Sequence, residues 1–212
     1  LPALLFSLLA FPARQRKSRG STEGWVSYRI FWKDPGMRGS LLVSFLTSGA
    51  TLAFLAFISG LGLTAGQITL LLMATGAASV LGAPVAGWLS DWFSKRLVFL
   101  FANTLLVFPL VVVAATGWGI RLFVLFFFLM LLAAARQTAL QAVQTELSGT
   151  TRRGAFLGLR NGFSQLGISC SVLVASYLFD WGGFPGVVAL TAGLTLTASL
   201  VFFLLVSEPE SV

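Results

Sequence analysis

The sequence predicts an all-α membrane protein with six transmembrane helices, and three observations support this fold class. Hydrophobic residues make up 57% of the chain and charged residues only 10%, whereas soluble domains carry about 25% charged residues. Several apolar runs are long enough to cross a hydrocarbon core, which takes about 20 helical residues. The Lys and Arg residues gather in alternate loops between these runs, as they do in membrane proteins.

The apolar runs place the predicted spans at 40–62, 67–89, 97–116, 121–144, 156–179 and 186–206. A shorter run at 1–11 cannot cross a membrane, and we interpret it as the end of a truncated transmembrane helix. We expect 12–39 to be a cytoplasmic linker and 207–212 a cytoplasmic tail, on either side of a six-helix bundle at 40–206.

The loop charges predict that both ends of this segment are cytoplasmic, because loops rich in Lys and Arg stay on that side. The linker is strongly basic, and the loops after the second and fourth spans contain Lys95–Arg96 and Arg152–Arg153. The alternate loops contain only Arg121. Topology and anionic lipid headgroups therefore explain the net charge of +7, and no nucleic-acid partner is implied.

The end of the linker, GWVSYRIFWKDP at 24–35, has helical periodicity. Trp25, Tyr28 and Trp32 fall at i, i+3 and i+7, with basic residues offset from them. The pattern favours an amphipathic helix at the membrane surface that ends at Asp34 and Pro35. The alternative is an irregular loop whose aromatic rings lie at headgroup depth.

Several kinds of chemistry have no residues from which to be built. The chain has no His and one Cys, Cys170, so a zinc cluster, a disulfide framework and His-based catalysis are all excluded. A membrane-embedded enzyme would need a catalytic set at one membrane face, and we find none. We therefore expect no catalytic residues, no metal and no cofactor.

The hairpin after the second span concentrates charge in APVAGWLSDWFSKR, at 83–96. Its spacing is Gly87-x-x-x-Asp91-x-x-x-Lys95-Arg96. Gly87 allows a close helix approach, and Asp91 is placed to accept hydrogen bonds from the N-terminus of a neighbouring helix.

This hairpin resembles the loop motif of the major facilitator superfamily. Trp92 stands where the motif usually has a basic residue and Ser94 where it usually has Gly, a degeneracy typical of the second copy of the motif. The resemblance covers nearly the whole chain and implies the C-terminal half of a transporter, namely helices seven to twelve. It also implies a missing N-terminal half of the same chain as partner, together with the lipid bilayer and a small-molecule substrate. The closest resemblance is to bacterial drug or sugar efflux permeases, which implies the bacterial inner membrane.

An internal similarity supports this interpretation. AGWLSDW at 86–92 aligns with ASYLFDW at 175–181, three spans later. An odd number of spans inverts topology, so Asp91 falls in the cytoplasm and Asp180 outside. This pattern predicts two inverted three-helix repeats.

Polar residues inside the spans are the candidates for substrate contact, because they are costly in lipid. The fourth span has an amide stripe of Gln137, Gln141 and Gln144, and the fifth has Asn161 and Gln165 followed by Ser169. The resemblance assigns the first and fourth spans to the cavity, so the predicted cavity residues are Thr47, Thr51, Arg136, Gln137 and Gln141. Asn161 and Gln165 of the fifth span are predicted to join them.

Arg136 lies deep in its span, where a charge costs at least about 2.5 kcal/mol, and three alternatives remain open for it. It binds an anionic substrate group or a coupling acid from the missing half, it pairs structurally with backbone carbonyls or a helix of the missing half, or it extends to the cytoplasmic face. Arg160, one turn into its helix, is expected to extend to that face. No Asp or Glu lies deep in the spans, so any buried carboxylate that binds a coupling proton must belong to the missing half.

The loop between the fourth and fifth spans contains Glu146, Arg152 and Arg153. The resemblance implies a cytoplasmic gate of ion pairs that includes Asp91 and Glu146, together with Lys95 and Arg96. The alternative is that Glu146 is merely solvated.

Taken together, the patterns and the resemblance predict secondary active efflux of a small molecule by alternating access, without covalent chemistry. The alternatives are a homodimeric half-transporter and a non-transporting six-helix membrane scaffold.

Overall fold

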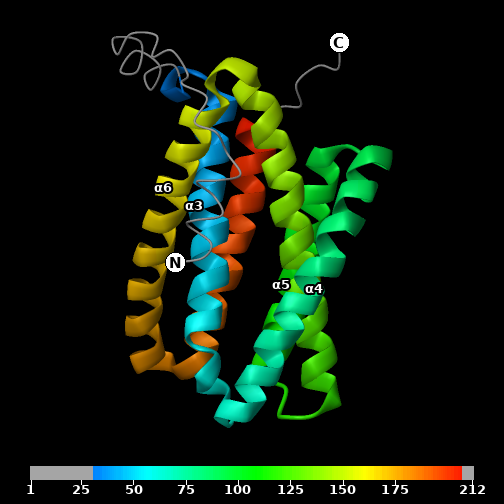
Figure 1. Ribbon diagram of the computed structural model, residues 1–212. Coiled ribbons are helices and arrows are strands. Elements are labelled where there is room, and N and C mark those ends of the chain that lie inside the picture. The colour runs from blue at the N-terminus through cyan, green and yellow to red at the C-terminus, as the bar shows by residue number, and fades with distance from the viewer. Residues whose placement is uncertain (1–30, 207–212) are drawn as a thin grey trace, which may run out of the picture.

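A computed structural model describes residues 31–206 of the protein, except for the side chains of 150–152. Within this range, five helical stretches are long and apolar enough to cross a membrane, and the last of them, Arg153–Leu205, contains two spans because it reverses at Gly183. The helices run roughly along one common axis and form a bundle (Figure 1).

The helices are α3 (Pro35–Ala56), the short 3₁₀ helix η1 (Ile58–Leu61), α4 (Ala65–Trp92), α5 (Lys95–Ala114) and α6 (Ile120–Leu205). The long α6 reverses direction at two glycines, Gly149 and Gly183, which have φ of 59° and 63°. Residues with a side chain rarely adopt such backbone angles, whereas glycine adopts them freely. We therefore divide α6 into a first span (120–149), a second span (153–182) and a third span (184–205).

All six predicted spans are present, with shifted ends. The first predicted span began at 40, but α3 begins at Pro35, and the fourth was predicted to end at 144, but the helix continues to Gly149. The predicted linker boundary at 39 therefore lies inside α3. Asp34 and Pro35 were expected to end a helix, and here they begin one, because Asp is a good N-cap and Pro fits the first turn.

Part of the predicted amphipathic helix, 24–30, lies outside the described residues, as do 1–11 and 207–212. Residues 31–33 are helical and precede Asp34. The ring of Phe31 packs edge-on against Phe156, and Trp32 lies against Phe163, with ring centroids 5.5 and 5.8 Å apart. This short segment is therefore fixed on the second span of α6.

Removing the cap of α3 should lower the stability of the bundle by a modest amount. The backbone N–H groups of Gly36 and Met37 donate to Asp34 Oδ1 at 2.8 and 3.4 Å. We expect Asp34→Ala to cost about 1 kcal/mol, measured as a lower thermal midpoint of the purified protein in detergent. Asp34→Asn keeps an accepting oxygen and should stay near wild type; equal losses for both variants would contradict a capping role.

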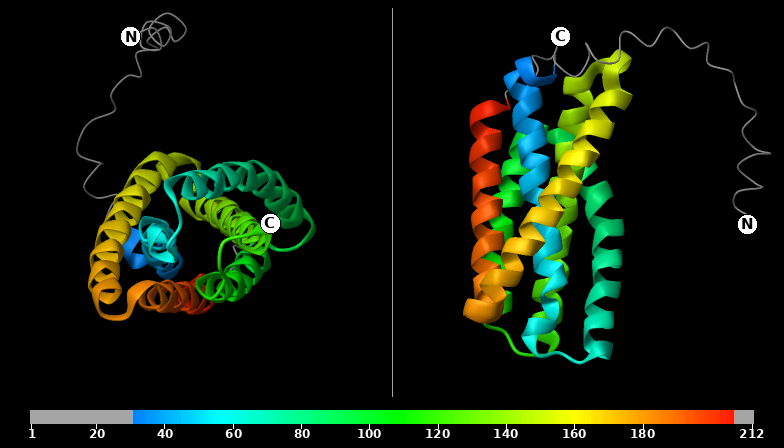
Figure 2. Two further views of the ribbon diagram at one scale, coloured as in Figure 1. Left: turned by 90° about the horizontal axis from the view of Figure 1, so that it is seen from below. Right: turned by 90° about the vertical axis from the view of Figure 1, so that its left-hand side faces the viewer.

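α3 is packed closely against the second span of α6, beside which it lies in both views of Figure 2. A Cβ added to Gly167 would overlap the backbone carbonyl of Phe45, and one added to Gly49 would overlap the Ser171 side chain. Small residues let two helix backbones approach in this way. The contact fixes which side of the second span faces inward.

The core consists of two main apolar clusters at different heights in the bundle. One includes Phe54, Leu110 and Phe126, and the other includes Val43, Phe99 and Leu140. Residues between them along the same helices, such as Thr47 and Arg136, are buried and polar. The bundle therefore has a polar layer between two apolar ones.

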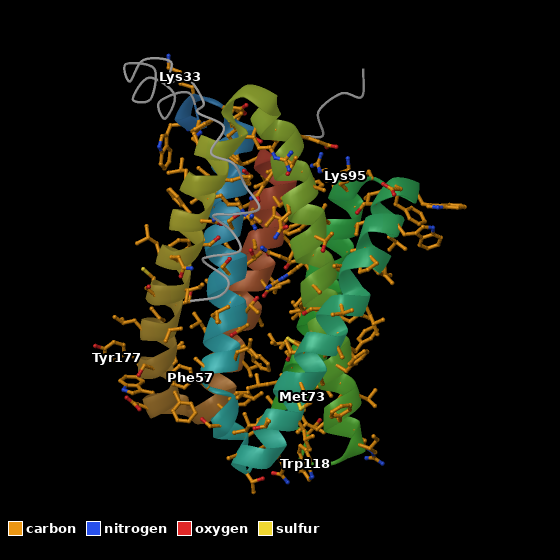
Figure 3. All side chains as sticks on the ribbon, viewed as in Figure 1. Lys33, Phe57, Met73, Lys95, Trp118 and Tyr177 are labelled. Carbon is orange, nitrogen blue, oxygen red and sulfur yellow. The ribbon has the colours of Figure 1, made fainter. Side chains whose placement is uncertain are left out.

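Exposed tryptophans lie at both ends of the helices, as is usual at the two membrane interfaces. Trp88 and Trp92 are exposed near the end of α4, with their rings 5.5 Å apart. Trp118 and Trp181 are exposed close to the α5–α6 connection and to the reversal at Gly183. Figure 3 shows Trp118 at one end of the bundle and Lys33 with Lys95 toward the other.

Candidate solute-binding site

Arg136 is the centre of the buried polar layer. Its side chain is 2% exposed, and its Nη2 donates to the Thr47 carbonyl at 3.0 Å and to Thr51 Oγ1 at 2.5 Å. Its Nη1 donates to Asn103 Oδ1 at 2.7 Å. The guanidinium of the first α6 span therefore joins α3 to α5.

Asn103 extends the network to the third span of α6. Its Nδ2 donates to the Thr195 carbonyl at 2.7 Å and to Ser199 Oγ at 2.8 Å. Beside the guanidinium, a small cavity bordered by Thr51, Thr191 and Thr195 has room for about one water molecule. Four of the bundle's spans thus share one hydrogen-bonded layer.

This geometry matches the second of the three alternatives for Arg136, with partners inside the bundle. Both terminal nitrogens already donate to protein oxygens, and these are the groups with which arginine holds an anion. Thr47 is buried and belongs to the same layer, and its Oγ1 donates to the Val43 carbonyl at 2.8 Å. Thr51 is half-buried, and its Oγ1 donates to the Thr47 carbonyl at 2.9 Å. The structure thus places Arg136, Thr47 and Thr51 in one hydrogen-bonded layer that joins α3 to the first span of α6.

The amide stripe of the first α6 span is divided between two environments. Gln144 is fully buried, and its Nε2 donates to the Ser40 carbonyl at 3.0 Å and to Ser44 Oγ at 2.6 Å. Gln137 is half-buried and Gln141 is exposed. Gln144 therefore holds α3, and the other two face outward.

The second α6 span exposes two more amides, Asn161 and Gln165. Within residues 31–206, these two side chains form no hydrogen bonds, and neither do Gln137 and Gln141. An amide moved from water into hydrocarbon without a partner costs about 4 to 8 kcal/mol. The four amides therefore need a polar neighbour, namely water, solute or protein.

Arg160 differs from the expectation that it extends to the cytoplasmic face. Its side chain is 8% exposed, and its Nε is buried without a hydrogen-bond partner. It lies one turn after Phe156, which is buried beside Phe31 and Leu41. Arg160 is therefore a largely buried side chain of the second span of α6.

The charged hairpin between α4 and α5 is tied to α6. Lys95 forms an ion pair with Glu146 of the first span. Arg96 Nη2 donates to the Phe203 carbonyl at 2.7 Å, and its guanidinium lies 5.3 Å from the centre of the Phe203 ring. Ser94 caps α5 by accepting from Leu97 N–H at 3.1 Å. These contacts all lie within one bundle.

The remaining residues predicted for the gate make few contacts. Asp91 is exposed and has no hydrogen bond to any described residue, and a Cβ on Gly87 would meet no atom within 4 Å. Arg153 is exposed, and the side chain of Arg152 lies outside the described residues. Glu146 is therefore paired with Lys95, whereas Asp91 forms no ion pair with any described residue.

The Lys95–Glu146 pair should contribute little to stability, because its side chains are 33% and 41% exposed. We expect a coupling free energy of about 0.2 to 1 kcal/mol that decreases with salt. A double-mutant cycle of Lys95→Met and Glu146→Gln, read as thermal midpoints, measures it. The charge-reversed double variant Lys95→Glu/Glu146→Lys should recover most of the loss, and a coupling above about 2 kcal/mol would contradict a solvent-screened pair.

Sequence reasoning did not assign roles to Asn103, Thr195 and Ser199. Asn103 is nearly the only polar residue in an apolar span, and Arg136 is the one charge deep in another. Two isolated polar groups in lipid favour each other as partners, so the sequence contained a signal for the contact between Asn103 and Arg136. The Thr and Ser residues gave none, since they can satisfy their hydroxyls within their own helix, as Thr195 does with the Thr191 carbonyl at 2.7 Å.

Comparison with known proteins identifies one family. The family model of the Major Facilitator Superfamily matches residues 39–212, a stretch that includes the polar layer, the outward amides and the charged hairpin. A search of curated proteins gave no match to the chain.

Proposed function

The chain belongs to the Major Facilitator Superfamily, whose members are membrane transporters, and from this premise we propose that it is the C-terminal half of a secondary transporter. In this proposal it moves a small solute by alternating access, rocking against an N-terminal half of the same protein. No bond in the solute is made or broken, so the protein is not an enzyme.

The single observation that carries the proposal is the set of unpaired outward amides. Four side-chain amides in membrane-spanning segments have no hydrogen-bond partners among residues 31–206; they belong to Gln137, Gln141, Asn161 and Gln165. Lipid is a poor neighbour for them, whereas a polar cavity between two halves satisfies them. We propose that these four amides line the solute site, with Thr47, Thr51 and Arg136 holding the helices behind them.

The orientation and the environment are also part of the proposal. Lys33, Arg38, Lys95, Arg96 and Arg153 lie near one end of the helices, and Arg121 lies near the other. By the preference of basic loops for the cytoplasm, we place the first end inside, in a bacterial inner membrane. If a proton is coupled to transport, its carboxylate belongs to the N-terminal half, because the described spans bury no Asp or Glu.

We propose export as the direction, in keeping with the resemblance to efflux permeases. The Lys95–Glu146 and Arg96–Phe203 contacts then hold the cytoplasmic end of this half together as it moves. Asp91 and Arg153, both exposed and unpaired within residues 31–206, remain for contacts that form between the halves.

The proposal is tested with the full-length protein in inside-out and right-side-out vesicles. Accumulation of neutral, anionic and cationic solutes is compared for wild type, Gln137→Ala/Gln141→Ala and a control, Thr197→Val, whose exposed hydroxyl bonds within its own helix. We expect at least a tenfold loss, about 1.4 kcal/mol, for the amide variant alone. If wild-type protein transports no solute in either vesicle orientation, the proposed function is refuted. Transport by the 212-residue chain alone would instead favour the homodimeric half-transporter.

A further inference from the structure

The second span of α6 presents two different surfaces to its surroundings. One is a polar row of exposed residues that follows the helix at spacings of four, four, seven and four. We call this row the polar sector; it consists of Asn161, Gln165, Ser169, Ser176 and Asp180. These spacings keep the side chains on one side of an α-helix.

The adjoining surface is apolar, and we call it the apolar sector. Its members are exposed and follow the helix beside the polar sector; they are Leu166, Cys170, Leu173, Val174 and Tyr177. Figure 3 shows Tyr177 pointing away from the bundle. This composition suits acyl chains, whereas the polar sector does not.

The helix cannot exchange these two surfaces by rotating. Its inner side is fixed by Gly167 against the backbone of Phe45 and by Ser171 against Gly49. A rotation that turned another residue toward α3 would replace Gly167 by a side chain where a single Cβ already overlaps the Phe45 carbonyl. The polar sector is therefore a permanent feature of the outer surface.

The polar sector is electrically neutral over most of its length. Ser169 Oγ donates to the Gln165 carbonyl at 3.0 Å within the helix, which leaves the amides of Asn161 and Gln165 and the hydroxyl of Ser176 as the free neutral hydrogen-bonding groups. Arg136 and Arg160 are 2% and 8% exposed. Across the described spans, no positively charged side chain is exposed at mid-membrane depth, and the row ends at the carboxylate of Asp180.

We infer that the polar sector lines the solute pathway from this half and that the solute is a neutral molecule rich in hydroxyl or amide groups. Each amide offers two donors and an acceptor to such a molecule. Anions would meet no exposed cation at mid-depth and would be repelled by Asp180. The inference rests on the proposed function and names the substrate class for its site.

Two adjacent residues allow a sharp test of the pathway. Cys170 is the one cysteine of the chain and lies in the apolar sector, whereas Ser169 lies in the polar sector. Full-length protein with Cys170 is compared with the variant Ser169→Cys/Cys170→Ser, with any cysteine outside this segment replaced by serine. Both are treated in membranes with trimethylammonioethyl and sulfonatoethyl methanethiosulfonate.

The cysteine at 169 should react about tenfold faster or more, because exchange at a thiol depends on access and a charged reagent enters the apolar surroundings of Cys170 only at a cost. Each reagent's rate at 169 is divided by its rate with a small free thiol. This normalised rate should be at least as high for the cationic reagent as for the anionic one. A cysteine at 169 that reacts no faster than Cys170 would overturn the pathway. A clear preference for the anionic reagent would overturn the neutral class.

Transport then tests the substrate class with Asn161→Ala/Gln165→Ala. We expect at least a tenfold loss for neutral polyols or amides, with Leu166→Ala as the control that stays near wild type. Transport of organic anions alone by the wild type would overturn the neutral class. If no solute is transported while the labelling contrast persists, the proposed function fails and the aqueous polar sector stands, so the two failures are distinguishable.

Discussion

Gly167→Ala should destabilise the bundle by about 1 to 3 kcal/mol, because the added methyl group must push α3 away from α6. The atoms that it meets belong to the backbone of Phe45, which cannot turn aside as a flexible side chain can. Larger residues such as Leu should prevent folding. The measurement is the thermal midpoint of purified protein in detergent, together with the yield of folded protein in the membrane.

The matched control is Gly193→Ala in the third span of α6, where a Cβ would meet no atom within 4 Å. Alanine has the higher helix propensity by about 1 kcal/mol, so this variant should keep or slightly raise the midpoint. If both alanine variants behave alike, the close contact between α3 and α6 does not limit stability. Gly49→Ala, on the other side of that contact, should resemble Gly167→Ala.

Arg136→Leu should cost about 3 to 5 kcal/mol, as is typical when one partner of a buried charged cluster is removed. The Thr47 carbonyl and Asn103 Oδ1 would lose their donor in a layer that water hardly reaches. Arg136→Lys should recover only part of the loss, since an ammonium cannot reproduce the planar fork of donors. Thermal midpoints of the three proteins give these differences.

Transport separates the packing role of Arg136 from a role in the substrate site. With a packing role, vesicle transport by Arg136→Gln falls by the same factor for neutral, anionic and cationic solutes, in step with the loss of folded protein. Arg121→Gln, which removes an exposed arginine at the other end of the same span, should leave both properties unchanged. If only the transport of anions is lost and the thermal midpoint stays normal, Arg136 binds the substrate.

Much of the fold could be predicted because apolar runs of membrane length leave few alternatives. The ends of the spans were harder, as α3 shows. Its first turn, beginning at Pro35, is polar and lacks the hydrophobic signal, and only the capping chemistry of Asp34 marks it. The reversals at Gly149 and Gly183 likewise depend on single backbone angles.

The candidate site could be predicted less well, because periodicity does not give the direction of a helix face. Each residue turns the helix by about 100°. The four-residue step from Gln137 to Gln141 goes slightly beyond one full turn, and the seven-residue step to Gln144 ends slightly before two full turns. Gln141 and Gln144 therefore lie on opposite sides of Gln137. The stripe read from the sequence therefore contains one residue that packs on α3 and another that faces outward. Which is which depends on where α3 lies, and that is set by glycines distant in sequence.

The polar layer also has a consequence for how the protein is made. The spans emerge from the ribosome in order, so Asn103 enters the membrane before Arg136, and the Thr195 and Ser199 acceptors come last. Until then the amide of Asn103 lacks two of its final partners. The run FVLFFFLMLL at 123–132 favours insertion of the span that contains Arg136, and this offsets the charge. A chain interrupted before the last span would thus leave the amide of Asn103 in lipid without two of its acceptors.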